Sequence, residues 1–366
     1  MKKIALVTLQ GNENIGNRLQ NYALQTLLER RKATVYNLWP VINHNPYELG
    51  KRRLKILLKL SLGMMGDNKY RKWSIYYRGH SIREKSIRNF SDAFIHNIVY
   101  TSYDNTVDDY DLGIVGSDQV WHRWNDDINN DSELNYYYLN FLPDRKRASY
   151  AASFGFTRFP DRDRNLHIKR LNEMRFISCR EREGCNLVKD VTGREVVHVL
   201  DPTLLIAPSE WRMLEKNIND YSKALETHSY AFVYFLGTIT DEYKEYIHKI
   251  CSKFNINTIV DFMDFNNNNI ASCGPEDFVF LIDHATYVFT DSFHCSVFSI
   301  LFKKNFVAFP RYEEGFTDMF GRIEELLEMT GNTERMFCDF CERGDIESFE
   351  DMKKKSLDYL DMILKS

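Results

Sequence analysis

Residues 287–309 constrain the fold of this chain more than any other stretch. Residues 287–290 form a short apolar run typical of a buried strand, and a turn at Asp291-Ser292 follows. Apolar side chains then recur at four-residue spacing through 293–302, as they do on one face of a helix. A second apolar run at 305–309 is typical of another strand. The pattern predicts a βαβ unit, and therefore an α/β fold.

His294 lies in the first turn of this predicted helix, just past the carboxyl end of a strand. Open α/β sheets bind their ligands at this edge. The free N–H groups of a helix N-terminus also favour anions there. His294 is therefore a candidate ligand-binding residue, although a buried histidine bonded to backbone would give the same pattern.

The chain has 366 residues, which is long for one hydrophobic core. Short apolar runs alternate with helical patterns in two successive series, so we predict an α/β protein with two Rossmann-like domains. Residues 208–229 are polar and irregular, which places the boundary there. We expect domains at 1–207 and 208–345, facing one another across a cleft. A C-terminal helix at 346–366 would pack back on the first domain.

The first strand-end loop, 10–15, precedes a helix predicted at 17–31. Its glycines have the spacing of a phosphate-binding loop, but Asn17-Arg18 stands where Lys-Ser/Thr is needed, which argues against such a loop. The G-x-G-x-x-G of dinucleotide binding is also missing. Two interpretations stay open. The loop is either a tight turn or a ligand-facing segment that includes Asn14 and Gly16.

Two further strand ends carry polar side chains. Gly116-Ser117-Asp118-Gln119 follows a predicted strand at 110–115, as either a helix cap or a ligand-facing turn. Arg180 follows another predicted strand, where it either pairs with an acidic neighbour at the surface or binds a ligand. Asp201 ends a third strand and is interpreted as structural, bonding nearby backbone N–H groups.

Residues 51–88 are rich in Lys and Arg and poor in acidic residues. The stretch predicts basic amphipathic helices. It is interpreted either as a solvated helix pair that covers the first sheet or as a surface that lies on an anionic membrane.

The net charge of -4 argues neither for nor against nucleic acid, and we expect no such partner. No apolar run approaches the roughly 20 residues that span a bilayer. The run after Met1 is too short for a signal peptide, so we expect a cytoplasmic protein, or one at the inner face of the membrane if 51–88 binds lipid. Seven scattered cysteines indicate reduced thiols. Cys338 and Cys341 form a C-x-x-C without the context of a redox or zinc site, so we expect no metal there.

Six motifs, in this order, resemble those of the polysaccharide pyruvyltransferase family, and they span nearly the whole chain. Each motif alone is weak, but six in order are specific. They are GNRLQNYALQ at 16–25, VGSDQVW at 115–121, SYAASFG at 149–155, SCRE at 178–181, DPTLL at 201–205 and TDSFH at 290–294.

The resemblance implies two Rossmann-like halves arranged as in GT-B glycosyltransferases, the first on the acceptor side and the second on the donor side. It implies transfer of pyruvate from phosphoenolpyruvate to two hydroxyls of a sugar, which forms a ketal and releases phosphate during capsule or exopolysaccharide synthesis. The acceptor would be a saccharide, expected to be lipid-linked. Phosphoenolpyruvate is then a substrate, and no cofactor is expected.

The resemblance also implies site residues. In relatives, an Arg that matches Arg180 and a His that matches His294 serve the donor. Ser292 stands where relatives carry another Arg, so a different cation must replace it. The candidates are Lys303, Lys304 and Arg311.

The implied chemistry needs cations and N–H donors for a carboxylate and a phosphate, and a proton donor for the enol methylene. We assign His294 as general acid or phosphate partner, Arg180 as anion clamp, and Asp118 as base or hydroxyl acceptor. Substrate binding is expected at Asn14, Gly16, Asn17, Gly116, Ser117, Gln119, Ser292, Lys304 and Arg311.

Two other functions fit the same pattern. A nucleotide-sugar glycosyltransferase of this fold would need a nucleotide pocket in its C-terminal half, and a nucleotide diphosphate sugar rather than phosphoenolpyruvate would stabilise it. A non-catalytic glycan-assembly protein at the membrane surface would depend on the basic segment 51–88. Charge reversal of Lys51, Arg52 and Arg53 would then abolish liposome binding.

Overall fold

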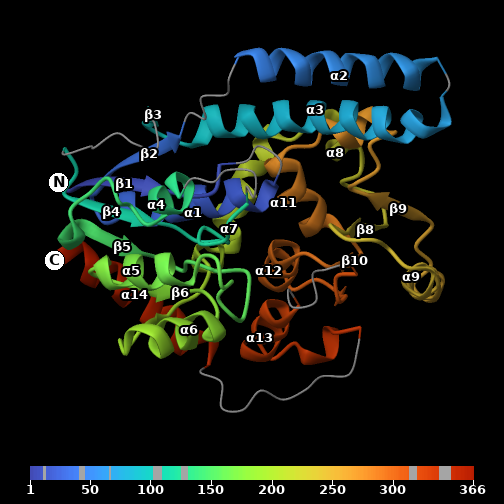
Figure 1. The fold of residues 1–366 in the computed structure, drawn as a ribbon. Helices are drawn as coiled ribbons and strands as arrows, with labels where there is room; N and C mark the ends of the chain where they lie inside the picture. The colour runs from blue at the N-terminus through green and yellow to red at the C-terminus, as the bar shows by residue number, and fades with distance from the viewer. Residues whose placement is uncertain are drawn as a thin grey trace.

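A five-stranded parallel sheet forms the first half of the chain in the computed structural model, which describes residues 1–10, 14–40, 46–65, 67–101, 109–124, 131–312, 320–337 and 348–366. In spatial order its strands are β3 (Ile98–Thr101), β2 (Thr34–Pro40), β1 (Lys3–Val7), β4 (Leu112–Val115) and β5 (Arg147–Ser149) (Figure 1). Isolated bridges lead from this sheet to a parallel pair, β6 (Ser178–Cys179) and β7 (Val197–His198). The carboxyl ends of these parallel strands lie at one edge.

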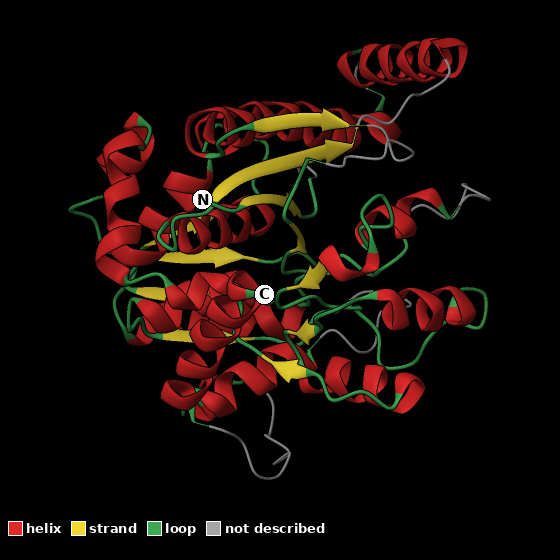
Figure 2. Cartoon of the chain, turned by 90° about the vertical axis from the view of Figure 1, so that its left-hand side faces the viewer, coloured by secondary structure: helices red, strands yellow, loops and turns green. Residues whose placement is uncertain are grey.

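The helices of the first half pack around this sheet or, in one case, on another helix (Figure 2). They are α1 (Ile15–Glu29), α2 (Pro46–Met64), α3 (Asn68–Phe94), α4 (Ser132–Tyr137), the 3-10 turn η1 (Asp144–Lys146), α5 (Arg164–Glu173) and α6 (Arg182–Thr192). Leu19, Ala23 and Leu27 of α1 are buried in the core at the four-residue spacing that the sequence shows, and most other residues of this helix are buried as well.

The second half contains the predicted βαβ unit, as β10 (Tyr287–Thr290), α12 (Phe293–Leu301) and β11 (Phe306–Ala308). With β8 (Tyr230–Tyr234) and β9 (Thr258–Asp261) these strands form a parallel sheet in the order β11-β10-β8-β9. The remaining elements are α9 (Asp241–Lys253), α10 (Asn268–Ala271), α11 (Pro275–His284), α13 (Gly321–Met329), η4 (Thr333–Arg335) and α14 (Phe349–Lys365). The predicted pair of Rossmann-like halves is confirmed.

The segment between the halves is not irregular, so that part of the prediction is wrong. It folds as η2 (Pro202–Leu205), α7 (Pro208–Trp211), η3 (Arg212–Asn217) and α8 (Asp220–Ala224). Pro208 suits the first turn of a helix, and the Asn219 side chain caps the next helix by accepting from Ser222 N. Local capping therefore outweighed the polar composition.

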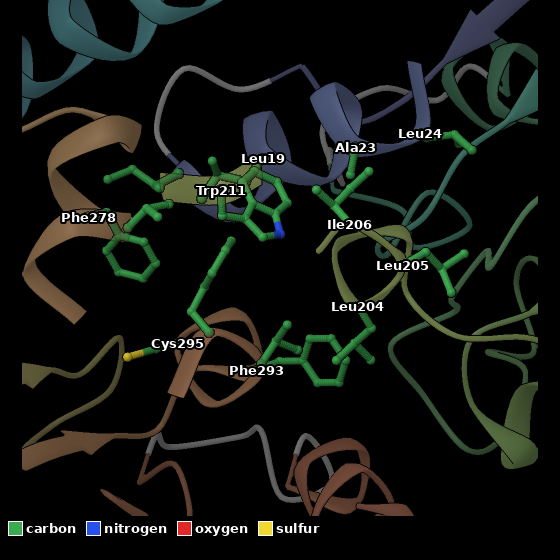
Figure 3. Close-up of a cluster of buried hydrophobic side chains, with 14 of the residues drawn as sticks. Leu19, Ala23, Leu24, Leu204, Leu205, Ile206, Trp211, Phe278, Phe293 and Cys295 are labelled. Atoms are coloured by element: carbon green, nitrogen blue, oxygen red, sulfur yellow. The ribbon is translucent and has the colours of Figure 1, made fainter. Parts of the chain in front are cut away.

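This connecting segment also joins the two halves through one hydrophobic core (Figure 3). The Trp211 side chain is fully buried, and its ring centroid lies 5.7 Å from Tyr22 of α1 and 5.0 Å from Phe298 of α12. The indole Nε1 donates to the Thr203 carbonyl at 3.2 Å. The halves are therefore packed together at the connector.

Replacing Trp211 with alanine should lower the free energy of unfolding by about 3–5 kcal/mol, because a large cavity would remain between the halves. Urea denaturation measures this loss. Trp73→Ala serves as the control, because Trp73 is only partly buried and stacks on Tyr77. Equal losses in the two variants would contradict a bridging role for Trp211.

Helix α14 lies against the first half although it ends the chain (Figure 1). Ser356 Oγ accepts from Leu200 N at 2.8 Å, and Tyr359 Oη donates to the Ser149 carbonyl at 2.9 Å. Both bonds are buried, so the helix fastens the β5 and β7 ends of the first sheet.

Helix α3 links the halves rather than covering only the first sheet. Its Arg83 is buried and donates to the carbonyls of Phe262, Ile270 and Ala271 in the second half. Helix α2 packs on α3 and lies outermost (Figures 1 and 2). Within the described ranges, no helix is both long and apolar enough to cross a membrane.

Candidate active site

A cavity of about 270 Å³ lies where the strand ends of the two halves meet. Lining residues from the first half, within the described part of the chain, are Asn14, Asp118, Gln119, His122, Trp124, Gly155 and Arg180. Those from the second half are Leu236, Ser292, Phe293, His294, Arg311 and Arg322. The site is therefore built by both halves, at the edge where α/β sheets bind ligands.

Asp201 is buried behind the first-half wall of the cavity, where it holds several side chains in place. Its Oδ1 accepts from the backbone N and the Oγ1 of Thr203, at 3.0 and 2.6 Å. Its Oδ2 accepts from Ser117 Oγ at 2.6 Å and from Arg180 Nη1 at 3.3 Å. The same oxygen lies 3.7 Å from His294 Nε2. One buried carboxylate thus positions a turn, a guanidinium and an imidazole.

The surroundings keep Asp201 ionised. Burial would raise the pKa of this carboxyl, but His294, Arg180 and the Ser117 hydroxyl together lower it well below its usual range. The separation of 3.7 Å from His294 Nε2 is too long for a hydrogen bond, so a protonated imidazole acts through its charge. The Asp201 carboxylate thus lies beside the His294 imidazole and stays charged.

Asp291 has the corresponding place in the second half. Its two carboxylate oxygens accept from the backbone N–H groups of Leu236 and Gly237, at 2.7 and 2.8 Å. Arg311 donates from Nε to Asp291 Oδ2 and from Nη2 to the Asp291 carbonyl, both at 3.3 Å. Arg180 of the first half and Arg311 of the second half are thus each held at the cavity by a buried aspartate.

Two helices begin at the cavity. The Asn14 side chain caps α1 by accepting from Gly16 N at 2.9 Å, and the Ser292 side chain caps α12 by accepting from Cys295 N at 3.5 Å. Both caps line the cavity. The partial positive charge of two helix N-termini thus adds to that of the guanidiniums, and it favours an anionic ligand.

Two glycines allow site side chains to come close to backbone. A Cβ on Gly16 would lie 2.2 Å from His294 Nδ1, and one on Gly237 would lie 2.7 Å from Arg311 Cγ. Such distances exclude any other residue unless the neighbour moves. Gly16 therefore fixes where the His294 ring of the other half can stand.

The charged groups that line the cavity are mainly cationic. Arg180, Arg311 and Arg322 face Asp118 as the one carboxylate among the described lining residues. Burial would lower the pKa of Arg180, but Glu181 and Asp118 raise it well above its usual value. Burial, followed by the charge of Arg180, lowers the pKa of Arg322 to about 10. The mutual repulsion of these guanidiniums would be relieved by a bound anion.

Asp118 has an unusual backbone conformation. Its φ is 77°, in the left-handed region that costs a non-glycine residue on the order of 1 kcal/mol or more. The turn is held because Ser153 N donates to the Asp118 carbonyl at 3.0 Å and Asp118 Oδ1 accepts from Gln119 N at 2.9 Å. Strain of this kind is common where a side chain must point into a ligand site.

The structure brings most of the residues predicted from the sequence to one place. Those that line the cavity are His294, Arg180, Asp118, Asn14, Gln119, Ser292 and Arg311. Their roles stay predictions. Arg180 also forms the ion pair that was its alternative interpretation, because its Nε donates to Glu181 Oε1 at 2.8 Å, but the pair is buried rather than at the surface.

Four other predicted residues lie behind the lining. Gly16 packs against His294, and Ser117 donates to Asp201. Gly116 packs closely against Thr8 and Leu24, and Asn17 is buried in the first turn of α1. These residues shape the wall of the site without lining it.

Lys304 does not line the cavity, contrary to the expectation of a substrate contact. Its Nζ donates to the Asp283 carbonyl at 2.5 Å. Lys304 follows the C-terminal end of α12. At a rise of about 1.5 Å per residue, this end lies roughly 13 Å from the N-terminal end of the helix, where the cavity is. Arg311 instead follows β11, which is parallel to β10 and so ends at the same edge.

Several site residues were missed by reasoning from sequence. Asp201 bonds the Thr203 N–H as predicted, but its contacts with Arg180 and His294 were not predicted. Asp291 was interpreted only as part of a turn, whereas it accepts from the N–H groups of Leu236 and Gly237. His122 and Trp124 lie just beyond the turn at 116–119. Arg322 had no signal at all, because its approach depends on how α13 packs.

Glu325 on α13 joins the two halves beside this site. Its Oε2 accepts from Arg182 N at 3.2 Å, and its Oε1 lies 3.4 Å from His198 Nε2. Burial raises the pKa of Glu325 to about 7. The folded state thus holds a proton that the unfolded chain releases at lower pH.

Replacing Glu325 with glutamine should therefore change the pH dependence of stability. A raised carboxyl pKa contributes stability below about pH 4.5 that is lost as pH rises through about 7. At pH 8 the Glu325→Gln variant should be more stable than the wild type by on the order of 3 kcal/mol. The melting temperatures of both proteins, measured from pH 5 to pH 8, test this difference. The same pH dependence of the melting temperature in both proteins would contradict it.

Solved structures of similar fold have low sequence identity to this chain. UDP-GlcNAc 2-epimerase from Methanocaldococcus jannaschii has a TM-score of 0.47 and 13% identity, covering 100% of this chain and 93% of that one. UDP-GlcNAc 2-epimerase from Neisseria meningitidis has a TM-score of 0.44 and 10% identity, covering 100% of both chains. ADP-heptose LPS heptosyltransferase II from E. coli has a TM-score of 0.35 and 10% identity, covering 99% of this chain and 98% of that one.

Comparison with curated proteins finds no match. The family model described as polysaccharide pyruvyl transferase matches residues 14–311. The match begins at the cap of α1 and ends at the second-half guanidinium, so it spans the cavity between Asn14 and Arg311. The chain belongs to the polysaccharide pyruvyl transferase family.

Proposed function

We propose that this protein transfers pyruvate from phosphoenolpyruvate to two hydroxyls of a saccharide. The observation that carries the proposal is the convergence of Arg180, Arg311 and Arg322 with His294 on one cavity. Phosphoenolpyruvate has a carboxylate and a phosphate on a three-carbon frame. Guanidinium groups bind both anions through paired N–H donors, so the charge and donor geometry match the ligand.

Arg180 and Arg311 hold the donor from the two halves. Each guanidinium is fixed on one side by an aspartate, which leaves other N–H groups for a ligand. Arg180 Nη2 is buried and has no hydrogen-bond partner among the described residues. The Phe293 ring lies 4.5 Å from the Arg180 guanidinium carbon and restricts its movement. A preorganised clamp of this kind loses little side-chain entropy on binding.

Bond changes in the proposed reaction balance with two acceptor hydroxyls. A proton is added to the methylene carbon of phosphoenolpyruvate, and cationic character develops at the carbon that bears phosphate. One sugar hydroxyl oxygen adds to that carbon, and the carbon–oxygen bond to phosphate breaks. The second hydroxyl adds in turn and closes the ketal. The two hydroxyls lose one proton each. One of these makes up for the proton that converted the methylene to a methyl group, and the other is carried by the released phosphate.

His294 supplies the proton to the methylene carbon in this scheme. Its side chain lines the cavity, and its Nε2, which is buried and without a hydrogen-bond partner among the described residues, lies 3.7 Å from Asp201 Oδ2. An imidazole can act as a general acid near neutral pH. Asp118, which lines the same cavity, is the proposed acceptor of a proton from a sugar hydroxyl.

Phosphate release tests the proposal directly. The purified protein is incubated with phosphoenolpyruvate and a panel of lipid-linked saccharides, and free phosphate is measured. Release that requires both substrates is the expected result. Melting is followed in parallel, because a ligand that binds the folded state raises the melting temperature. Stabilisation by a nucleotide diphosphate sugar but not by phosphoenolpyruvate would overturn the proposal in favour of a glycosyltransferase.

The lipid linkage of the acceptor is supported by the surface of α2. Leu54, Leu57 and Leu58 are 60–70% exposed on this outermost helix, and Lys55 is exposed beside them. Apolar side chains interleaved with cations match an anionic membrane surface. The proposed place of the protein is therefore the inner face of the membrane.

Vesicle binding separates this surface from the catalytic proposal. The wild type should sediment with vesicles that contain phosphatidylserine and remain in solution with phosphatidylcholine alone. Leu54→Ser combined with Leu58→Ser should abolish sedimentation without changing phosphate release to a water-soluble acceptor. Equal sedimentation of the variant would exclude α2 as the contact.

A further inference from the structure

An exposed tryptophan lies at the cavity among residues that the donor chemistry does not use. The chain has five tryptophans, all in the described part of the structure. Trp121 and Trp211 are fully buried, whereas Trp124 is 52% exposed and lines the cavity. A large ring that is left half in water at a cavity is suited to bind an apolar ligand surface.

The Trp124 ring is held in a defined orientation although it is exposed. Its Nε1 donates to the Gln119 carbonyl at 3.2 Å. Its ring centroid lies 4.7 Å from that of His122, with an angle of 61° between the planes. A ring restrained at its polar edge and packed on one side presents its remaining face to a ligand with little loss of conformational entropy.

Groups that bind hydroxyls lie beside this ring. The Gln119 amide lines the cavity, and it lies so close to Gly155 that a Cβ there would be 2.5 Å from Nε2. Gly155 has a φ of 71°, which favours glycine and keeps this approach open. Asp118, the residue before Gln119, adds a carboxylate. An aromatic face with an amide and a carboxylate matches a sugar ring, whose C–H face is apolar and whose edge carries hydroxyls.

We infer that Trp124, Gln119 and Asp118 form the subsite for the acceptor sugar ring. The sugar packs its C–H face on the Trp124 indole and directs two hydroxyls toward Asp118 and the donor. This assignment names the acceptor site of the proposed pyruvyl transfer. The direction of the hydroxyls rests on that proposed function, whereas the stacking of the sugar on Trp124 does not. The guanidiniums of Arg180, Arg311 and Arg322 are assigned to the anionic donor, and Asp118 Oδ1, which lies 3.6 Å from Arg180 Nη1, is where the two ligands would meet.

The subsite separates two kinds of ligand within one cavity. A neutral sugar has no charge to pair with three guanidiniums, and a phosphorylated acid gains little from an indole face. Trp124 therefore acts as a specificity-determining residue for the acceptor. Substitutions there should change saccharide affinity and leave donor affinity as it was.

Direct saccharide binding tests the subsite without relying on turnover. Methyl glycosides of hexoses and N-acetylhexosamines are titrated calorimetrically into the wild type, Trp124→Ala and Trp124→Phe. The glycoside that binds the wild type best should lose roughly tenfold or more in affinity to Trp124→Ala, the scale of one aromatic contact, and much less to Trp124→Phe. Tyr100→Ala is the matched control, since Tyr100 is 67% exposed outside the cavity and its loss should change nothing.

Stabilisation by phosphoenolpyruvate is measured on the same variants. The rise in melting temperature should be equal in the wild type and Trp124→Ala. Unchanged glycoside affinity in Trp124→Ala, or no glycoside binding by the wild type, would overturn the subsite. Glycoside binding that depends on Trp124, together with no response to phosphoenolpyruvate, would support the subsite while refuting the proposed donor.

Discussion

Replacing His294 with glutamine is expected to lower the rate of pyruvyl transfer by about 10²–10⁴, the usual contribution of a general acid. Glutamine fills similar space and keeps a side-chain N–H group, but it cannot deliver a proton to carbon. Asp201 keeps its bonds from Ser117, Thr203 and Arg180, so the fold around it should persist.

Phosphate release under saturating phosphoenolpyruvate measures this effect, and thermal melting checks the fold. His248→Gln is the matched control, because His248 is exposed on α9 and does not line the cavity. Loss of a general acid should lower kcat, whereas the affinity for phosphoenolpyruvate should change little. Near-normal kcat in purified His294→Gln would remove His294 from the proposed mechanism.

Replacing Gly16 with alanine should impair the reaction almost as strongly, although Gly16 does not line the cavity. The new Cβ would lie 2.2 Å from His294 Nδ1 and would push the imidazole from its place beside Asp201. Gly16 lies within α1, where alanine is favoured over glycine by up to about 1 kcal/mol. The α1 helix should therefore remain intact while activity falls.

A double-mutant cycle separates this effect from general damage. If Gly16→Ala acts through His294, it should cost little further activity in the His294→Gln background. Circular dichroism and melting should show a folded protein in every case. Full activity of Gly16→Ala, or equal losses in both backgrounds, would show that the glycine does not act by positioning the imidazole.

The secondary structure could be predicted where a segment has its own strong pattern. The stretch 287–309 folds as expected, because its strand and helix periods are both complete and a cap residue separates them. The connector at 208–229 could not be predicted, because its helices are short and are held by the burial of Trp211 between the halves. Composition does not record that burial.

The residues of the site could also be predicted where they follow a predicted strand. Arg180, Asp118 and His294 each follow a strand, and parallel strands end at a common edge, so their approach follows from the fold. Lys304 was placed wrongly because it lies near His294 in sequence but at the opposite end of a helix. Arg322 comes from α13 and reaches the cavity only through tertiary packing.

The sequence by itself determined the two Rossmann-like halves, the family and the strand-end residues that face the cavity, because periodicity and local capping depend only on neighbours along the chain. Only the tertiary structure decided which other residues contact these strand-end residues. The buried carboxylates of Asp201 and Asp291, the contact of Gly16 with His294, and the exposed face of Trp124 depend on distances between segments far apart in the chain. The βαβ unit at 287–309 supplies His294, but the opposite half determines where its imidazole stands.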